Sequence, residues 1–331
     1  MKLSVGRMTH GPRNLLTDVG GVRVGHCTVD DGGCHTGVTV ILPHYGNPYT
    51  EKLTAASVVF NGFGKSLGLM QLEELGTLET PIALTNTLNV GKVHDALVSW
   101  MLERCAQDGI RLTSVNPVVC ECNDGRISDI ARRPVGQREV YSAIGSASEQ
   151  FAQGAVGAGR GTVCYGLKGG IGSSSRVFEI GGEQFTVGVL AQTNYGASSD
   201  FRLAALPPEL AESDQGSIVL IVATDLPLSC RQLKRVLRRC SVGMARLGSY
   251  IGHGSGELAV GFTTSPRVPA GEGFSTLRVL DESWMNTPFR AVGEATEEAI
   301  LQSMLAASPD VTLDGRRVAT LQERLNSAGN R

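Results

Sequence analysis

The stretch of sequence with the clearest chemical potential is a Gly-Ser pair that stands directly before an apolar run. Polar residues 212–215 lead into Gly216 and Ser217, and the apolar residues 218–222 follow. The simplest interpretation is a turn that feeds a buried strand. The alternative is a chain that cuts itself before Ser217 and then uses the serine hydroxyl as a nucleophile, because a glycine leaves the scissile carbonyl unshielded.

The cysteines and histidines form no recognisable metal-site motif. No second pair follows the C-x-C of Cys120 and Cys122 at zinc spacing, and the chain has no H-E-x-x-H. The histidines and cysteines between residues 26 and 35 lack motif spacing as well. The N-terminus has no apolar segment of the length that a secretory signal needs, so we expect reduced thiols, a cytoplasmic protein, and neither metal nor cofactor.

Two glycine-rich stretches fail as nucleotide-binding motifs. The stretch NGFGKS (61–66) resembles the end of a phosphate-binding loop, but that motif needs a glycine where Val59 stands. The tract from Gly154 to Arg176 has no G-x-G-x-x-G that opens a helix. Such a density of glycines predicts backbone packed against backbone or against a substrate.

Strands and helices must position the Gly216–Ser217 pair and any other residues that act with it. Apolar, β-prone runs recur, and several are apolar throughout, as in strands covered on both faces. They begin at residues 37, 55, 80, 116, 185, 217 and 257. Helical periodicity marks residues 93–105, 233–244 and 300–305. We therefore expect an α/β fold with sheets inside and helices outside.

Composition excludes several classes of protein. The net charge is −2 over 331 residues and 41% of the residues are apolar, so a large core is possible and nothing favours nucleic acid or a membrane as partner. No stretch reaches the ~18 consecutive apolar residues of a membrane span. A basic stripe within residues 231–239 is interpreted as the solvated face of an amphipathic helix.

Several segments together resemble the DmpA-like family of L-aminopeptidases/D-esterases and β-peptidyl aminopeptidases. They follow the family's order over most of the chain, which makes the match more specific than any single motif. The matching stretches are LLTDVGGVRVGH (15–26), PIALTNTLNVG (81–91), VVCECNDG (118–125), GAVGAGRGTVCYGLKGGIGSSSR (154–176), AQTNYG (191–196), DQGSIVLIVATDLPL (214–228) and GSGELAVGFTT (254–264).

The resemblance implies a single α/β domain over residues 1–331, a four-layer αββα sandwich that is shared with ornithine acetyltransferases. It implies self-cleavage between Gly216 and Ser217 into chains 1–216 and 217–331, with Ser217 as the nucleophile. It also implies hydrolysis of an N-terminal residue from a peptide, amide or ester, and it suggests a homo-oligomer, a tetramer.

Four further residues complete the site that the resemblance implies. Ser255 and Glu257 match the family's serine–acid pair, and residues two apart on a strand point the same way, so both could face Ser217. Asn194 matches the asparagine that stabilises the oxyanion, and Glu121 matches the acid that binds the substrate amine. Ser255 is expected to orient the nucleophile and relay its proton, with Glu257 as the acid that polarises Ser255. The free α-amine of Ser217, with a reference pKa of about 7.7–8.0, is the other candidate for the general base.

The chain departs from the family's pattern near the expected amine site. Asn123 stands where some members have a tyrosine whose hydroxyl helps to hold the oxyanion. The Asn123 amide could donate in its place or could only shape the pocket. Lys65 and Arg160 are also atypical and could alter the pocket, so the family's substrate preference is not carried over.

The sequence therefore predicts a metal-independent serine aminopeptidase with an N-terminal nucleophile, acting on small substrates that carry a free amine. An acyltransferase of the ornithine acetyltransferase type is one alternative, and it would need an amine acceptor. A non-catalytic binding protein of the same fold is another, and it would remain an uncut chain. Ser217 together with the Ser255–Glu257 pair favours hydrolysis.

Overall fold

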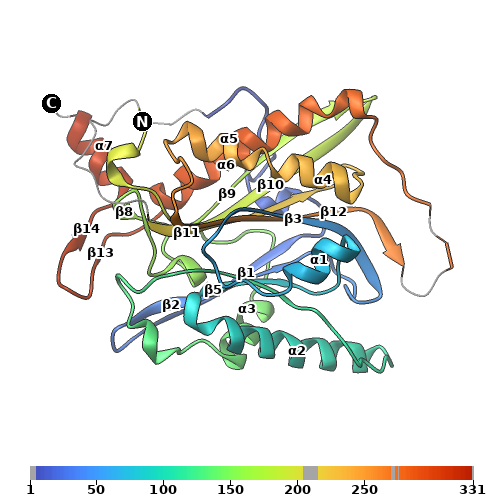
Figure 1. Cartoon of the computed structure of the whole chain (residues 1–331), viewed down its shortest axis with the longest axis horizontal. Coiled ribbons are helices and arrows are strands. Elements are labelled where there is room, and N and C mark those ends of the chain that lie inside the picture. The colour runs from blue at the N-terminus through green and yellow to red at the C-terminus, as the bar shows by residue number, and fades with distance from the viewer. Residues whose placement is uncertain (1–4, 204–214, 270–272, 275, 330–331) are drawn as a thin grey trace.

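Two β-sheets lie face to face in the middle of the computed structural model, which describes residues 5–203, 215–269, 273–274 and 276–329 (Figure 1). The smaller sheet has the strand order β1 (Arg23–Asp31), β2 (Cys34–Leu42), β5 (Ile82–Asn86) and β6 (Val118–Cys122). The larger sheet has the order β4 (Thr77–Leu78), β3 (Glu51–Gly62), β12 (Gly254–Pro269), β11 (Gln215–Thr224), β10 (Glu183–Asn194) and β9 (Gly170–Ile180). Every apolar run predicted as a strand lies in one of these sheets.

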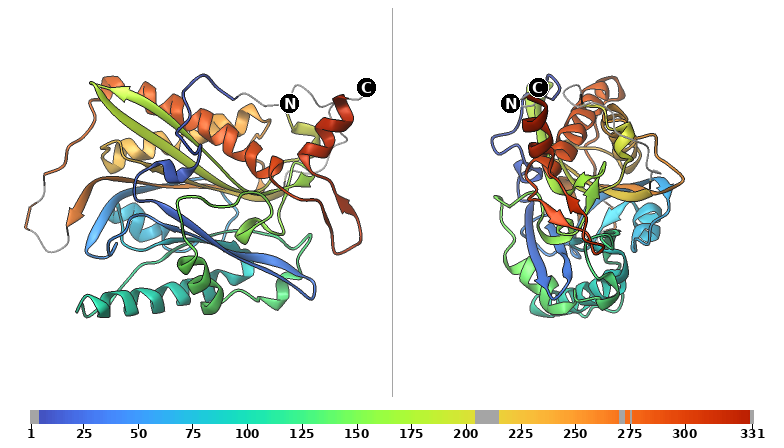
Figure 2. Two further views of the ribbon diagram at one scale, coloured as in Figure 1. Left: turned by 180° about the vertical axis from the view of Figure 1, so that it is seen from behind. Right: turned by 90° about the vertical axis from the view of Figure 1, so that its left-hand side faces the viewer.

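Helices cover the outer face of each sheet. The smaller sheet carries α2 (Val90–Gln107) and α3 (Gln137–Gly145). The larger sheet carries α4 (Cys230–Leu237), α5 (Cys240–Arg246) and α6 (Asn286–Leu305). The views of Figure 2 show the resulting four layers from behind and from one side, which confirms the predicted αββα sandwich. Within the described residues, no helix combines the length and the apolar character needed to cross a bilayer.

Shorter elements complete the chain. The helix α1 (Leu69–Leu75) packs on β3, and α7 (Leu321–Gly329) packs on α6. Two small antiparallel pairs lie outside the main sheets: β7 (Val163–Cys164) with β8 (Leu167–Lys168), and β13 (Asp310–Val311) with β14 (Arg317–Val318). The 3₁₀ helices are η1 (Leu16–Asp18), η2 (Thr87–Asn89), η3 (Ile130–Arg132), η4 (Gly157–Gly159), η5 (Ser198–Asp200) and η6 (Glu282–Trp284).

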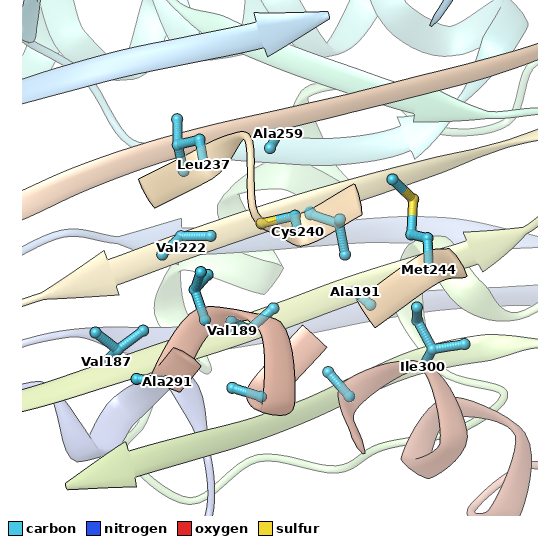
Figure 3. Packing of buried hydrophobic residues seen from close by; sticks show 14 of the residues in the cluster. Val187, Val189, Ala191, Val222, Leu237, Cys240, Met244, Ala259, Ala291 and Ile300 are labelled. Carbon is cyan, nitrogen blue, oxygen red and sulfur yellow. The ribbon is translucent and has the colours of Figure 1, made fainter. Parts of the chain in front are cut away.

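Alternation along β11 divides its side chains between two cores. Val219 and Ile221 pack in the core between the two sheets, whereas Leu220 and Val222 pack in the core beneath the outer helices. Figure 3 shows this second core, where residues of β10–β12 meet residues of α4–α6. Burial of each such Val, Leu or Ile side chain contributes about 1.5–3 kcal/mol. The same alternation turns the side chain of Ser217 toward the smaller sheet.

The periodic residues between 233 and 244 form two helices rather than the one predicted. The helix α4 ends at Leu237 and α5 begins at Cys240, yet the periodic residues keep their predicted buried side. Gly243 lets α5 approach α6 closely, because a Cβ atom at this position would lie 2.7 Å from the carbonyl oxygen of Gly293. The basic stripe on α4 faces outward, and its Arg231 and Arg235 pair with Glu282.

The glycine-dense tract brings backbone segments into contact, as predicted. A Cβ atom on Gly172 of β9 would lie only 2.0 Å from the carbonyl oxygen of Ala299 in α6, so that only glycine allows this helix to rest on the strand. All eight cysteines are free, and six of them are buried. Burial raises the pKa of Cys120 and of Cys240 to about 12, which keeps both thiols protonated and unreactive.

Candidate active site

A pocket of about 220 Å³ opens where strands of both sheets meet. Five of the residues predicted for the site line it. Gly216 and Ser217 come from the start of β11, Asn194 is the last residue of β10, and Glu121 and Asn123 come from the end of β6. Residues 212–214, the rest of the polar stretch before the pair, lie outside the described residues. The fold therefore gathers residues from three distant parts of the chain around Ser217.

The hydroxyl of Ser217 is buried and has no hydrogen-bond partner among the described residues. Ser217 pairs with Asn194 in the antiparallel register of β11 and β10, so the two side chains lie on the same face of the sheet. The thiol of Cys122 lies behind Ser217 and is 3.4 Å from its carbonyl oxygen. A buried hydroxyl without a partner carries an energetic cost, and such groups are typical of functional sites.

The residue before Ser217 can only be glycine. Gly216 has φ = +144°, a conformation that side-chain-bearing L-residues rarely adopt. A Cβ atom at this position would also lie 2.0 Å from the carbonyl oxygen of Asn194. The conformation that requires glycine thus falls at the peptide bond that the sequence predicts to be cut, and the missing side chain leaves its carbonyl unshielded.

Ser255 and Glu257 of β12 flank this peptide bond but do not share the face of the Ser217 side chain. In the parallel register of β11 and β12, Ser255 pairs with Gly216 and Glu257 with Ile218. The partner of Ser217 is Gly256. A Cβ atom on Gly256 would lie 2.7 Å from the carbonyl oxygen of Phe63, a residue that lines the pocket. Since side chains alternate along a strand, Ser255 and Glu257 point to the opposite face.

That opposite face is the helix side of the larger sheet. Both Ser255 and Glu257 are fully buried, and the Ser255 hydroxyl has no hydrogen-bond partner among the described residues. Burial, followed by the nearby Tyr165 hydroxyl and Cys164 thiol and last by Glu257, raises the pKa of Tyr195 well above its usual value. The spacing in the sequence allowed both side chains to face the Ser217 hydroxyl, whereas the register places them on the opposite face.

The amide of Asn194 is held in a fixed orientation at the pocket. Its Oδ1 atom accepts a hydrogen bond of 3.0 Å from the backbone N–H of Val163 in β7. This bond leaves the Nδ2 group as the donor available to the pocket. Val163 lines the pocket too, although nothing in the sequence marked it, because its contact with Asn194 joins strands that are far apart in the chain.

The carboxylate of Glu121 forms the negative end of the pocket. Its side chain is buried, Oε1 accepts a 3.0 Å hydrogen bond from the backbone N–H of Lys65, and Oε2 accepts one from the hydroxyl of Thr87. An ionised carboxylate has about four lone-pair sites, so it can still accept hydrogen bonds from an ammonium group. Thr87 was not singled out in the sequence, where an isolated threonine carries no signal.

Two of the three atypical residues lie at the pocket. Asn123 is exposed there, and its Oδ1 atom accepts a 2.9 Å hydrogen bond from the N–H of Gly125, which leaves its NH₂ group open. Lys65 is exposed at the rim, with Nζ 4.6 Å from the centre of the Phe63 ring. Arg160 does not line the pocket; its guanidinium forms salt bridges with aspartates of β1 and β13.

Two buried charged groups stabilise the loops that surround the pocket. Lys168 is fully buried, and its Nζ donates 3.0 Å hydrogen bonds to the carbonyl oxygens of Thr162 and Gly169, which flank the β7–β8 pair. Burial lowers the pKa of Lys168 to about 7. Asp124 follows Asn123, is also fully buried, and accepts hydrogen bonds from Asn86; burial raises its pKa to about 6.

We expect Asp124 to make the protein less stable as the pH rises from about 4 to about 6. The pKa of Asp124 rises from 3.8 to about 6 on folding, so between these values the unfolded chain has lost a proton that the folded protein keeps. Relative to the Asp124→Asn variant, the melting temperature should therefore fall across this window. Thermal melts of the uncut Ser217→Ala chain, with and without Asp124→Asn, provide the measurement; parallel curves would contradict the assignment.

The described residues contain no group of three or more His, Cys, Asp or Glu side chains arranged to hold a metal ion. The imidazole of His26, which drew attention in the sequence, instead contacts the hydroxyl of Thr39 at 2.9 Å and the carbonyl oxygen of Ala152 at 3.1 Å. Burial lowers the pKa of His26 to about 4, so the ring is neutral. Its surroundings are those of a structural histidine.

Comparison with known proteins places this geometry in context. The model of peptidase family S58 matches residues 14–318. The β-peptidyl aminopeptidase BapA of Sphingosinicella xenopeptidilytica is 36% identical, over 90% of this chain and 82% of its own length. A Burkholderia sp. β-aminopeptidase structure superposes with a TM-score of 0.88, at 38% identity over 99% of this chain and 96% of that one.

A third relative is similar over the same extent. The L-aminopeptidase D-Ala-esterase/amidase of Ochrobactrum anthropi superposes with a TM-score of 0.90, at 32% identity over 98% of this chain and 95% of that one. Its structure is described as a prototype for the serine aminopeptidases and as a new variant among the Ntn hydrolase fold. The four-layer arrangement and the strand order found here belong to that kind of fold.

Proposed function

Because the chain belongs to peptidase family S58 and is an aminopeptidase, we propose that it processes itself and then releases N-terminal residues through an acyl-enzyme on Ser217. The observation that carries this proposal is the pocket in which Ser217, Asn194 and Glu121 meet. Nucleophile, oxyanion donor and amine-binding carboxylate are the three functions that such a reaction needs. The substrates are peptides, amides or esters with a free amine.

Self-cleavage comes first in this mechanism. The Ser217 hydroxyl attacks the carbonyl carbon of Gly216, the C–N bond breaks, and the acyl group moves from nitrogen to oxygen. Water then hydrolyses the ester, which gives a carboxylate on Gly216 and a free α-amine on Ser217. The conformation of Gly216, with φ = +144°, supports this step because it requires a residue without a side chain, which leaves the scissile carbonyl unshielded. The products are chains 1–216 and 217–331.

Turnover uses the same hydroxyl. Its oxygen attacks the substrate carbonyl while its proton passes to the α-amine of Ser217, whose reference pKa of about 7.7–8.0 suits a base at neutral pH. The Nδ2 group of Asn194 donates to the oxyanion, and the leaving amine takes the proton. Water then hydrolyses the acyl group from Ser217.

The position of Ser255 and Glu257 favours a role at the amine rather than at the hydroxyl. Their backbones flank the Gly216–Ser217 bond, but their side chains point to the other face of the sheet from the Ser217 side chain. The new α-amine lies in the plane of the sheet, between the two faces, where a carboxylate can stabilise its ammonium form. In this proposal Ser255 and Glu257 position the base. That base is the α-amine of Ser217, which accepts the proton of the Ser217 hydroxyl.

We expect Glu121→Gln to lower the turnover of free-amine substrates sharply, mainly through KM, while self-cleavage proceeds normally. The neutral amide cannot offer a substrate ammonium the charge that the buried carboxylate provides. Rates with matched free and N-acetylated anilides of one amino acid give the readout, and intact-mass spectra report cleavage.

Glu79→Gln is the matched control, because Glu79 is a buried carboxylate with hydrogen-bonded partners that does not line the pocket. It should retain the preference for the free amine. If wild-type protein hydrolysed free and acetylated substrates equally well, Glu121 would not bind the amine and the aminopeptidase mechanism proposed here would be wrong.

A further inference from the structure

A second pocket, of about 560 Å³, opens directly beside the active-site pocket. The two pockets share Arg126 and Val163 in their linings. The opposite wall is the turn between β13 and β14, which is tied to the first wall by a 3.0 Å hydrogen bond from the N–H of Leu313 to the carbonyl oxygen of Arg126. The volume lies within the range of ~300–1,000 Å³ that is usual for ligand sites.

The lining of this second pocket carries an excess of positive charge. Arg126, Arg316 and Arg317 line it, against the single acid Asp314. Arg316 pairs with Asp314 at 2.9 Å and Arg317 pairs with Glu323 at 2.6 Å, and all four side chains are exposed. Exposed ion pairs contribute little, so a carboxylate of a bound ligand can replace their partners on the guanidinium groups.

The two adjoining pockets carry different groups. Glu121, Ser217 and Asn194 line the first pocket, Val163 and Arg126 border both pockets, and Arg316 and Arg317 line only the second. A substrate whose amine pairs with Glu121 and whose carbonyl lies at Ser217 can extend its leaving part past Val163. There it meets guanidinium groups, which bind carboxylates with two parallel hydrogen bonds.

We propose that the second pocket binds the leaving part of the substrate and favours leaving groups that carry a carboxylate. This inference rests on the proposed function. When the scissile C–N bond breaks, the acyl part stays on Ser217 and the leaving nitrogen takes a proton, so the amine departs through a pocket that has held its carboxylate. The carboxylate is either the C-terminus of a dipeptide or an acidic side chain.

The test compares four substrates that share one N-terminal residue X: the p-nitroanilide, X-Ala, X-Ala-amide and X-Asp-amide. We expect kcat/KM for X-Ala and for X-Asp-amide to exceed that for X-Ala-amide by about tenfold, the size of one charge-assisted hydrogen bond. An advantage for X-Ala alone assigns the site to the C-terminus, and one for X-Asp-amide alone assigns it to the side chain. The advantage should shrink at ~1 M salt, because exposed charges are screened.

Variants test which side chains cause the preference for a carboxylate in the leaving part. Arg317→Ala and the double change Arg316→Ala with Arg317→Ala should bring the acid-to-amide ratio close to one. Arg278→Ala is the matched control, since Arg278 also forms an exposed pair with a glutamate but lines neither pocket. It should keep the ratio. If Lys65→Met removed the preference and the arginine changes did not, the carboxylate would bind near Lys65 at the rim of the active-site pocket, and the inference would be wrong.

The outcomes separate the inference from the function on which it rests. Hydrolysis of the p-nitroanilide with equal kcat/KM for X-Ala and X-Ala-amide would overturn the inference and leave the proposed function standing. Failure of the cleaved protein to hydrolyse any of the four substrates, over a range of residues X, would overturn both.

Discussion

Replacing Ser217 with alanine is expected to leave one uncut chain whose activity is lower by more than about 10³-fold, since serine hydrolases without their nucleophile lose most of their catalysis. The same hydroxyl performs self-cleavage and turnover, so both must disappear together. The change should not unfold the protein, because the hydroxyl is buried without a described hydrogen-bond partner and its removal breaks no hydrogen bond. Hydrolysis of a free-amine anilide and a melting curve give the two readouts.

Ser217→Cys separates the two reactions. A thiol can make the same acyl shift, so this variant is expected to cut itself at a measurable rate. It should be the poorer hydrolase, because the pocket is shaped for an oxygen nucleophile. Should Ser217→Ala retain wild-type turnover, a different residue would be the nucleophile, and the roles proposed for Asn194 and Gly216 would lose their basis.

The second large effect is expected at Asn194. Removal of one oxyanion donor typically costs ~10²–10³ in kcat, so Asn194→Ala should lower kcat by that factor and change KM much less. The orientation of the amide supports this assignment, because its oxygen is held by the N–H of Val163 and its NH₂ group remains for the substrate. The measurement must use the cleaved fraction, since self-cleavage passes through an oxyanion as well.

Asn194→Asp provides the matched comparison. It keeps an oxygen that can accept from Val163 but replaces the donor by a second oxygen. Asn194→Asp should therefore lose at least as much kcat as Asn194→Ala, because its second oxygen cannot donate and an ionised carboxylate repels the oxyanion, although only the alanine loses the contact with β7. A rise in KM at constant kcat in both would identify Asn194 as a binding residue instead.

Much of the fold could be predicted from the sequence, because hydrophobic periodicity depends on neighbouring residues. The strand that begins at Ser217 is apolar throughout and lies, as expected, between two cores. A special role for Gly216 was expected because glycine leaves the carbonyl before Ser217 unshielded, and its φ of +144° is a conformation that favours glycine. The predicted single helix over residues 233–244 is two helices, because apolar periodicity continues across the break between Leu237 and Cys240 and so does not reveal it.

The arrangement of the site was harder to predict, because it depends on register between distant strands. Spacing placed Ser255 and Glu257 on one face of β12, but only the pairing of Ser255 with Gly216 shows which face that is. Thr87 and Val163 orient Glu121 and Asn194 through long-range contacts, and neither belongs to a motif. Residues of this kind can be found only once the strands are paired.

The most direct test of the account is an intact-mass spectrum of freshly purified, active protein. Self-cleavage by Ser217 predicts two masses, for residues 1–216 and 217–331, with the second chain beginning at Ser217 and the pair together heavier than the uncut chain by one water. The Ser217→Ala chain should give one mass. A single uncut mass from an active preparation, or cleavage of Ser217→Ala as complete as that of the wild type, would contradict self-processing by Ser217.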